Sequence, residues 1–407
     1  MKYHANVVKF FIFCFLINLH LWIPIWIIFL QDRGMSYVQI GVLDSIVLVI
    51  MTIMEIFTGA VADKYGRKTS MLIGTLLFSL GMLGLVTQVL SPIFILGFII
   101  WGTSFTFISG ADMAFLYDSL KAENKEDKYN KLMGRYLFIV QGSQLLASLL
   151  GGYIASLDMT YNFIITSVIS LVAFVVALTF NEPPQSNEGS SNDEKSYFQT
   201  VIQGLRIFIY NSKIRYIVIL GALLIVMPVL LTLVVIQPYA IHVGYSVANL
   251  GLIIVCVRIA GMIGSLTSNW FSRKYNHWSL ISIVLLVIMI CYALIWIYPM
   301  LVTIVPFAII SFVASLVRPV MSDLLNKSIS GNQRATILSI QSLLFTLFLT
   351  ILEPLIFILG EKSGLPMAVG LSGIFLVTLS LILIKLWRSS EIVFLKKEKE
   401  YPEIKTR

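Results

Sequence analysis

Long apolar runs separated by short polar segments recur along the whole chain. Each run holds about 20 residues, which is the length of an α-helix that crosses a bilayer. The runs do not alternate between apolar and polar residues, as the strands of a membrane barrel do. The pattern therefore predicts twelve membrane-spanning helices, at residues 8–30, 38–62, 69–89, 92–117, 133–156, 159–181, 215–241, 246–271, 278–298, 300–324, 335–359 and 364–387.

The composition agrees with a chain that lies mostly in lipid. Of its 407 residues, 58% are hydrophobic and 12% are charged, whereas soluble domains are about 25% charged. The three cysteines, Cys14, Cys256 and Cys291, lie in apolar runs and lack the spacing of a disulfide or metal site. We find no phosphate-binding loop, nucleophile elbow or dinucleotide fingerprint in the sequence. We therefore expect no enzyme activity, no metal and no bound cofactor.

The net charge of +8 is explained by membrane orientation rather than by a nucleic-acid partner. Of the 29 Lys and Arg residues, all but four lie on the side of the predicted spans that holds the N-terminus. Lys and Arg accumulate on the cytoplasmic side of membrane proteins. The distribution therefore predicts a multi-pass protein of the inner (cytoplasmic) membrane with both termini in the cytoplasm. The four exceptions are Arg33 and Lys362 on the opposite side and Arg258 and Arg318 within spans.

The two halves of the chain resemble each other at a shift of 210 residues. Gly34, Ser36 and Gly41 recur, in order, as Gly244, Ser246 and Gly251. A parallel repeat of six spans is typical of transporters that bind their substrate between the two halves. The repeat predicts two six-helix bundles, and we expect the protein to be a monomer.

The predicted domains are a first bundle at 1–181, a cytoplasmic linker at 182–214, a second bundle at 215–388 and a charged tail at 389–407. The stretch 181–196 is polar and rich in Pro, Gly and Ser, which is typical of a flexible linker. The stretch 197–213 mixes apolar residues with Arg206 and Lys213. It is either an amphipathic helix on the inner membrane surface or an exposed lead-in to the next span.

The loop after the second predicted span carries a recognisable motif. Its sequence GAVADKYGRK, at 59–68, resembles the signature loop of the major facilitator superfamily. The segments 109–120 and 332–343 are similar to those of bacterial members grouped with drug exporters. The resemblance implies an all-α fold of two six-helix bundles that rock between inward-open and outward-open states. Span 5 departs from the family's antiporter motif, because Ser143, Ala147 and Ser148 replace two glycines and a proline.

Charged residues in and near this loop are candidates for a gate. Glycines permit a tight turn and close helix approach, and Asp63 can pair with Arg67, Lys64 or Arg135. Ion pairs at the mouth of a cavity would hold one closed state and break in the other. The predicted gating residues are Gly59, Asp63, Lys64, Gly66, Arg67, Lys68, Asp118 and Arg135, with Arg273, Asp323 and Arg334 as their counterparts in the second half.

Ionisable residues inside the spans are candidates for proton or substrate binding, because such groups are costly in lipid. Glu55 lies about 12 Å of helix before Asp63 and is either a proton carrier or part of the gate cluster. Asp112 and Arg318 occupy similar places in the two halves, and either bind substrate or pair across the halves. His20 is either titratable or a packed interior histidine. The full candidate set is His20, Glu55, Asp112, Arg258, Arg318 and Glu353.

The sequence thus predicts a secondary active transporter. The favoured activity is proton-coupled export of amphiphilic small molecules such as antibiotics, in which Glu55 or Asp112 carries the proton. The expected partners are a small-molecule substrate, protons and the lipid bilayer, with the proton gradient as energy source. One alternative is proton-coupled uptake of a nutrient on the same fold. Another is a membrane receptor that binds its ligand without transporting it.

Overall fold

The computed structural model describes residues 4–184, 204–329 and 331–400. Contacts between residues divide the chain into two compact units, Met1–Gly189 with Gln237–Val255, and Ser190–Ile236 with Cys256–Arg407. Every regular element in the described ranges is helical, which confirms the predicted all-α class. Most of the predicted linker and the last residues of the tail lie outside the described residues, so those predictions stay open.

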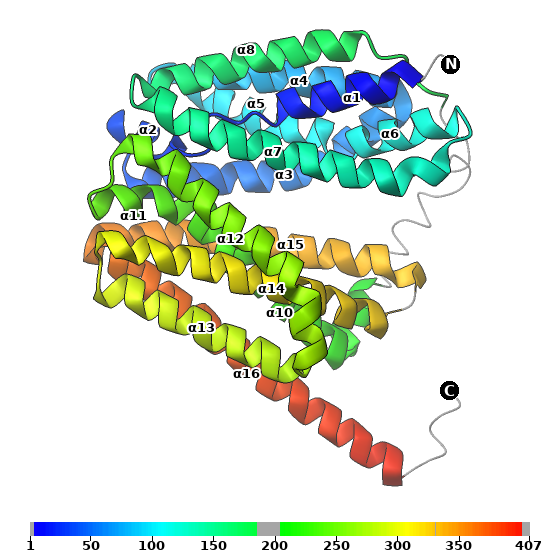
Figure 1. Cartoon of the computed structure of the whole chain (residues 1–407), viewed down its shortest axis with the longest axis vertical. Helices are drawn as coiled ribbons and strands as arrows, with labels where there is room; N and C mark the ends of the chain where they lie inside the picture. The colour runs from blue at the N-terminus through cyan, green and yellow to red at the C-terminus, as the bar shows by residue number, and fades with distance from the viewer. Residues whose placement is uncertain (1–3, 185–203, 330, 401–407) are drawn as a thin grey trace. The chain divides into compact units, whose positions relative to one another are not determined.

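The first half of the chain forms eight α-helices and one short 3-10 helix. They are α1 (His4–Ile17), α2 (Trp26–Asp32), α3 (Tyr37–Tyr65), α4 (Arg67–Leu85), α5 (Pro92–Ile108), α6 (Ala111–Lys121), η1 (Glu126–Lys128), α7 (Tyr129–Ala155) and α8 (Met159–Leu178). Two of the predicted spans are interrupted. The first consists of α1, an irregular segment and α2, and the fourth consists of α5 and α6 (Figure 1).

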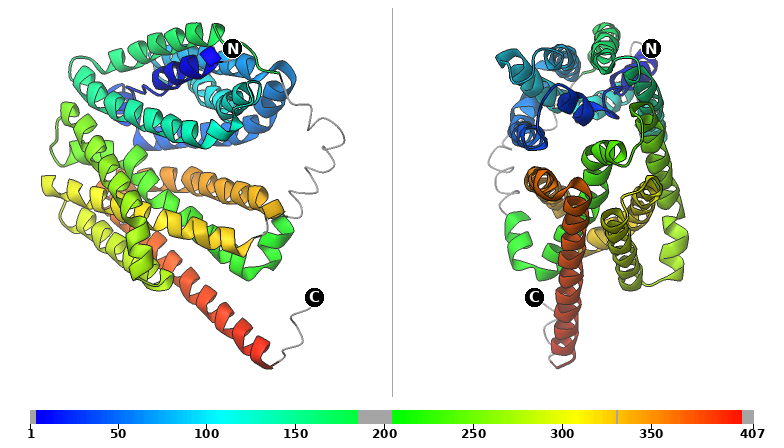
Figure 2. Two further views of the ribbon diagram at one scale, coloured as in Figure 1. Left: turned by 45° about the vertical axis from the view of Figure 1, so that its right-hand side comes forward. Right: turned by 90° about the vertical axis from the view of Figure 1, so that its left-hand side faces the viewer.

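The second half repeats this order with fewer interruptions. Residues 204–210 are helical. They are followed by α10 (Ser212–Val229), the π-helix η3 (Leu230–Val235), α11 (Ile236–His242), α12 (Val247–Lys274), α13 (His277–Ile297), η4 (Leu301–Thr303), α14 (Ile304–Ser328), α15 (Gly331–Ser363) and α16 (Leu365–Glu400). Figure 2 shows α16, in red, extending well beyond α13 of the same unit.

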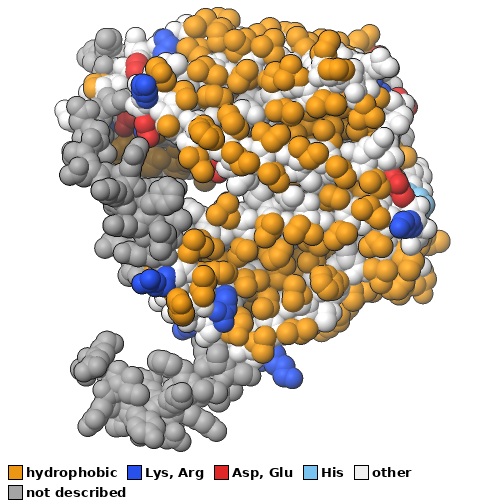
Figure 3. All heavy atoms as spheres, turned by 180° about the vertical axis from the view of Figure 1, so that it is seen from behind, with side chains coloured by type: hydrophobic (Ala, Val, Ile, Leu, Met, Phe, Trp, Pro, Cys, Tyr) orange, Lys and Arg blue, Asp and Glu red, His pale blue; other side chains and the backbone are white. Residues whose placement is uncertain are grey.

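Eleven helices in the described residues are long and apolar enough to cross a membrane, and α1 is a shorter apolar helix. The prediction of one continuous helix at 8–30 is therefore wrong. Many large apolar side chains on these helices are exposed, among them Phe138 and Leu266. Figure 3 shows apolar side chains over most of the visible face, with charged side chains gathered near its edges. This surface is suited to contact with lipid, and the chain is a multi-pass membrane protein.

The backbone shows the internal repeat that the sequence predicts. Gly34 and Gly244, which are 210 residues apart, have φ angles of +93° and +99°. Each lies two residues after a seven-residue helical element, α2 or α11, and these two elements begin and end at positions that also differ by 210. L-residues rarely adopt such φ angles, so glycine is needed at both turns. The recurring glycines therefore mark the same structural feature in each half.

The interruption of the first span leaves backbone groups that helical hydrogen bonds do not satisfy. The fully buried Gln237 supplies partners for two of them. The Ile27 amide donates to Gln237 Oε1 at 3.0 Å, and Gln237 Nε2 donates to the Ile23 carbonyl at 2.9 Å. Unsatisfied backbone groups cost several kcal/mol in a bilayer, so this side chain stabilises the break.

Candidate functional site: the loop after α3 and the break in span 4

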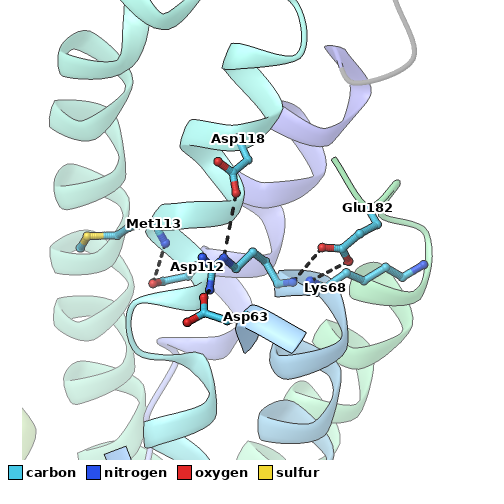
Figure 4. Close-up of polar contacts among 7 residues, drawn as sticks. Asp63, Lys68, Asp112, Met113, Asp118 and Glu182 are labelled. Atoms are coloured by element: carbon cyan, nitrogen blue, oxygen red, sulfur yellow. Dashed lines mark hydrogen bonds and ion pairs between the residues drawn. The ribbon is translucent and has the colours of Figure 1, made fainter. Parts of the chain in front are cut away.

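The first candidate site is the loop at 63–68, here called the first-half loop. Gly66 connects α3 to α4 with a φ of +98°. The turn brings Arg67 back toward α3, where Nη1 lies 2.6 Å from Asp63 Oδ1. On its other side Arg67 Nε lies 4.0 Å from Asp118 Oδ2 on α6 (Figure 4). One guanidinium thus interacts with carboxylates on two helices, as the predicted gate cluster requires.

A third carboxylate, that of Glu182, binds the backbone of this loop. Its two oxygens accept hydrogen bonds from the backbone amides of Arg67 and Lys68, at 2.7 and 2.9 Å (Figure 4). These amides are at the N-terminus of α4, where donors have no helical partner and a negative charge is favourable. A Cβ on Gly66 would lie 2.7 Å from Glu182 Cδ. Glycine is therefore needed here because the φ angle is positive and because a side chain would collide with the Glu182 carboxylate.

Burial of the Glu182 carboxylate raises its pKa above the ordinary value, although the residue as a whole is exposed. The two amide hydrogen bonds and the charges of Lys68 and Arg67 oppose this rise and offset only part of it. The ionised form is the one that accepts both amide hydrogens. The cap that Glu182 forms on α4 is therefore sensitive to protonation in a pH range above that in which an ordinary glutamate is protonated.

The first-half loop binds the end of α8, and α1 binds the start of the linker. Lys68 Nζ donates to the carbonyls of Leu178 and Phe180, each at 2.8 Å. Asn6 of α1 donates to the carbonyl of Asn181 at 2.8 Å and accepts from its amide at 3.0 Å. The linker predicted to be flexible from residue 181 is therefore fixed at its first two residues, which the polar composition of the segment did not reveal.

The second candidate site is the break in span 4. Ser109 and Gly110 separate α5 from α6, and Gly110 has a φ of +79°. Asp112, which is 8% exposed, lies in the first turn of α6. Its Oδ1 accepts from the Met113 amide at 2.7 Å and its Oδ2 accepts from the Tyr136 hydroxyl at 2.9 Å.

The surroundings of Asp112 are mostly apolar. Tyr136 stacks on Phe10, with ring centroids 5.9 Å apart, and Phe10 in turn stacks on Phe115. No Lys or Arg in the described part of the chain forms an ion pair with Asp112. The break thus exposes helix-terminal amides that bind the carboxylate, and it places an acid within the bundle without a cation beside it.

A cavity of about 250 Å³ lies between the two candidate sites. Its lining includes Asp63 and Arg67 from the first-half loop, Thr58 from α3, and Phe107 and Gly110 from the break in span 4. Gly59 also lines it, and a Cβ there would meet no atom within 4 Å. The motif glycine at 59 therefore faces open space, whereas the motif glycine at 66 is closely packed.

Other predicted residues of the first half lie apart from this cluster. Lys64 lies over the Tyr65 ring, and Arg135 is exposed with no ion pair in the described ranges. Of the three alternative partners predicted for Asp63, the structure shows Arg67. Glu55 is exposed on α3. His20 lies in the irregular segment after α1 and packs against aromatic rings, including Phe78 at 5.5 Å.

The second-half candidates make only local contacts. Asp323 forms an ion pair with Lys327 at 2.6 Å on the surface of α14. Arg273 and Arg334 are exposed, and among the residues described here neither forms an ion pair with a carboxylate. Arg318 is also exposed on α14, next to Pro319. The predicted second-half gate is thus not assembled into a cluster like that of the first half.

Two further candidates are engaged inside the second half. Arg258 is half-buried near the middle of α12, and Glu353 is fully buried on α15 next to Pro354. Both interact with neighbouring groups. Their roles in proton or substrate binding remain predictions.

Sequence reasoning missed Glu182, Tyr136 and Gln237. Glu182 stands directly after span 6 and before two prolines. An acid at this position indicates that the start of the linker could bind to the bundle. Tyr136 directly follows Arg135 but carried no signal of its own, because contact with Asp112 depends on how α6 and α7 pack. Gln237 is a polar residue in an apolar span, and such residues usually satisfy a buried partner.

The fold and these sites define a multi-pass transporter built from two repeated halves. The sequence matches the model of the Major Facilitator Superfamily over residues 10–352. The chain belongs to the major facilitator superfamily.

Two bacterial proteins are similar to about half of the chain. It is 27% identical over 201 residues to the uncharacterized MFS-type transporter YxaM of Bacillus subtilis, covering 49% of each chain. It is 22% identical over 190 residues to the quinolone resistance protein NorA of Staphylococcus aureus, covering 47% of this chain and 48% of that protein. The chain thus spans about half the length of the curated relatives it matches.

Solved structures with the same fold cover almost the whole chain. The nucleoside transporter NupG superposes with a TM-score of 0.73 at 14% identity, covering 94% of this chain and 98% of NupG. A bacterial homologue of the human lysosomal transporter Spinster superposes with a TM-score of 0.70 at 15% identity, covering 97% and 98%. At these identities the likeness extends to the fold alone.

Proposed function

We propose that this transporter exports amphiphilic small molecules in exchange for protons, and that Asp112 carries the proton. The observation that supports this assignment most strongly is the geometry of Asp112, a buried carboxylate at a helix break with two hydrogen-bond donors and no paired cation in the described residues. A carboxylate in apolar surroundings gains little from remaining ionised and can take up a proton. Glu55, the other candidate carrier, is exposed and lacks such a setting.

The proposed cycle couples Asp112 to the first-half loop through the cavity between them. Protonation of Asp112 removes the charge that the Met113 amide and the Tyr136 hydroxyl stabilise. The break at Ser109 and Gly110 then has one fewer fixed contact and can rearrange. Because Gly110 and Arg67 line the same cavity, a rearranged break changes the space in which Arg67 holds Asp63 and Asp118. The gate opens when this ion-pair cluster breaks.

A relative and the composition of span 4 support the proposed substrate class. NorA is named for quinolone resistance, and this chain resembles half of it. Span 4 is rich in aromatic residues, including Trp101 and Phe105, which contact each other with ring centroids 5.6 Å apart. Apolar pockets with few polar groups suit amphiphilic ligands. We therefore place amphiphilic antibiotics first among the substrates to be tested.

Drug susceptibility in a bacterium that lacks its own exporters tests this function. The bacterium expresses the wild type, Asp112→Asn or Asp127→Asn, and is grown on a compound panel with and without an uncoupler. Asp127 is an exposed acid on η1 and serves as the matched control. We expect resistance to at least one compound from the wild type and Asp127→Asn, abolished by the uncoupler, and none from Asp112→Asn. Equal resistance from Asp112→Asn would overturn the proton role of this residue.

The direction of transport needs its own measurement. In inverted membrane vesicles energised by respiration, an exporter accumulates substrate inside the vesicle, whereas an uptake symporter does not. Accumulation of a compound from the panel supports export. Accumulation only in right-side-out vesicles would establish the uptake alternative, and binding without flux would establish a receptor.

A further inference from the structure

The helical residues 204–210, here called the linker helix, have two different faces. Gly204 is buried, Ile207 and Phe208 are half-buried, and these three residues lie on one side of the helix. Leu205, Arg206, Ile209 and Tyr210 are exposed on the other side. Residues four positions apart lie on the same face of a helix, so Leu205 lies beside Ile209, Arg206 lies beside Tyr210, and the two pairs form one continuous surface.

The buried face fixes the linker helix to the second unit. A Cβ on Gly204 would overlap the Thr336 side chain of α15. At the other end Arg215 donates a hydrogen bond to the carbonyl of Ile209, and the Asn211 side chain accepts from the Ile214 amide at 3.2 Å at the start of α10. The linker helix is therefore held at Gly204 and at Ile209, directly before the start of span 7.

The exposed face combines large apolar groups with positive charge. Ile209 is 55% exposed and Tyr210 is 81% exposed. Residues 204–216 contain three cations, Arg206, Lys213 and Arg215, and no acid. In water the apolar groups would be unfavourably exposed, and in the hydrocarbon core the cations would be. The headgroup region of a bilayer accommodates both, with aromatic rings at the interface and cations near phosphates.

We propose that the exposed face of the linker helix, Leu205, Arg206, Ile209 and Tyr210, lies in the headgroup region of the cytoplasmic leaflet and binds anionic phospholipids. The apolar side chains enter the upper acyl region, and Arg206 pairs with lipid phosphate. The basic residues at the start of span 7 add attraction to a negatively charged leaflet. The linker thus contributes a lipid-dependent anchor at the base of α10 and α15, which the transport proposal neither requires nor implies.

The test uses the full-length protein with an environment-sensitive fluorophore on Tyr210→Cys. Cys256, the exposed native cysteine, is replaced by Ser, while Cys14 and Cys291 are buried and stay. Phe375→Cys, on an exposed position of α16, is the lipid control, and Asp127→Cys is the aqueous control. Each protein is reconstituted in phosphatidylcholine, with or without phosphatidylglycerol, and is quenched by iodide or by lipids that carry a nitroxide in the headgroup.

We expect the label at residue 210 to be quenched by headgroup nitroxide and protected from iodide, more strongly in vesicles that contain phosphatidylglycerol. Arg206→Gln should lower the phosphatidylglycerol-dependent association of the linker helix with the headgroup region about fivefold. This change corresponds to about 1 kcal/mol for one basic residue near an anionic surface. Iodide quenching equal to that of Asp127→Cys would overturn the proposal in favour of an exposed helix. Protection from both quenchers would overturn it in favour of a protein partner, and an unchanged Arg206→Gln would overturn the lipid-charge contact.

Discussion

The two halves of this repeat place the same loop in different surroundings. In the first half, Gly66 turns the chain so that Arg67 meets Asp63 and Asp118 while Glu182 caps α4. The second-half loop, residues 273–276, has no glycine. Its charged residues make only local contacts, such as Lys274 over the Trp270 ring at 5.0 Å. A repeated backbone therefore does not imply a repeated network.

Spans 4 and 10 differ in the same sense. Span 4 breaks at Ser109 and Gly110, and the break holds Asp112 in the bundle. Span 10 continues as the single helix α14 through Pro319, and Arg318 beside it is exposed. The ion-pair cluster and the buried acid at a helix break are thus found in the first half, whereas the buried Glu353 of the second half lies within the continuous helix α15. We infer that the proposed switch lies in the first half.

The largest effect should come from Gly66→Ala. A φ of +98° is strained for alanine, and its Cβ would displace Glu182. Such strain costs about 1–3 kcal/mol, and we expect a clear loss of thermal stability and of transport. Gly59→Ala is the matched control, because its Cβ meets open space. Equal effects of the two substitutions on the midpoint of thermal unfolding would show that Gly66 has no special role.

Arg67→Gln should have the next largest effect. It removes the guanidinium that lies 4.0 Å from the carboxylate of Asp118, a side chain that is 13% exposed. We expect a loss of about 1–2 kcal/mol, below the value for a fully buried pair. In the second half, Lys327→Gln breaks an ion pair whose side chains are 73% and 59% exposed. Such pairs contribute about 0–1 kcal/mol. If unfolding of the purified protein is shifted as much by Lys327→Gln, the two halves are more alike than we infer.

Glu182→Ala tests the cap on α4. Loss of a helix N-cap costs about 1 kcal/mol, and the same cost applies to Asn276→Ala, since the Asn276 side chain caps α13 through the Trp278 amide at 3.1 Å. We expect similar losses of stability from the two variants but a loss of transport rate only from Glu182→Ala. The comparison is made in vesicles at equal protein content. Reduced transport by both variants would remove the functional distinction between the caps.

The smallest effect should appear in the pH dependence of Glu182→Gln. Because burial raises the pKa of Glu182, the folded protein binds this proton more tightly than the unfolded chain. The contribution of Glu182 to stability is therefore greatest at low pH and falls as pH rises through its folded-state pKa. The unfolding midpoint of the wild type minus that of Glu182→Gln should increase from about pH 7.5 to about pH 5. A difference that shrinks on acidification would mean that the amide hydrogen bonds at α4 lower the pKa of Glu182 by more than burial raises it.

The sequence was sufficient for the membrane class, the repeat and most of the spans, because apolar length and recurring glycines are local signals. The motif at 59–68 also predicted the ion pair of Asp63 with Arg67 and named Asp118 as a second acceptor, while the gating role of this cluster stays a prediction. It did not reveal the breaks at Ser109 and in the first span, since hydropathy is the same for a straight and an interrupted helix. The contact of Tyr136 with Asp112 depends on how α6 and α7 pack, which leaves no local signal in the sequence.

The proton role of Asp112 is tested most directly by comparing exchange with gradient-driven transport in proteoliposomes. For a compound identified by the susceptibility panel, we predict that Asp112→Asn still exchanges labelled for unlabelled substrate but no longer moves it against its concentration when a pH gradient is imposed. Retained exchange shows that the variant folds and binds. Gradient-driven accumulation by Asp112→Asn at the wild-type rate would contradict the assignment of the proton to Asp112.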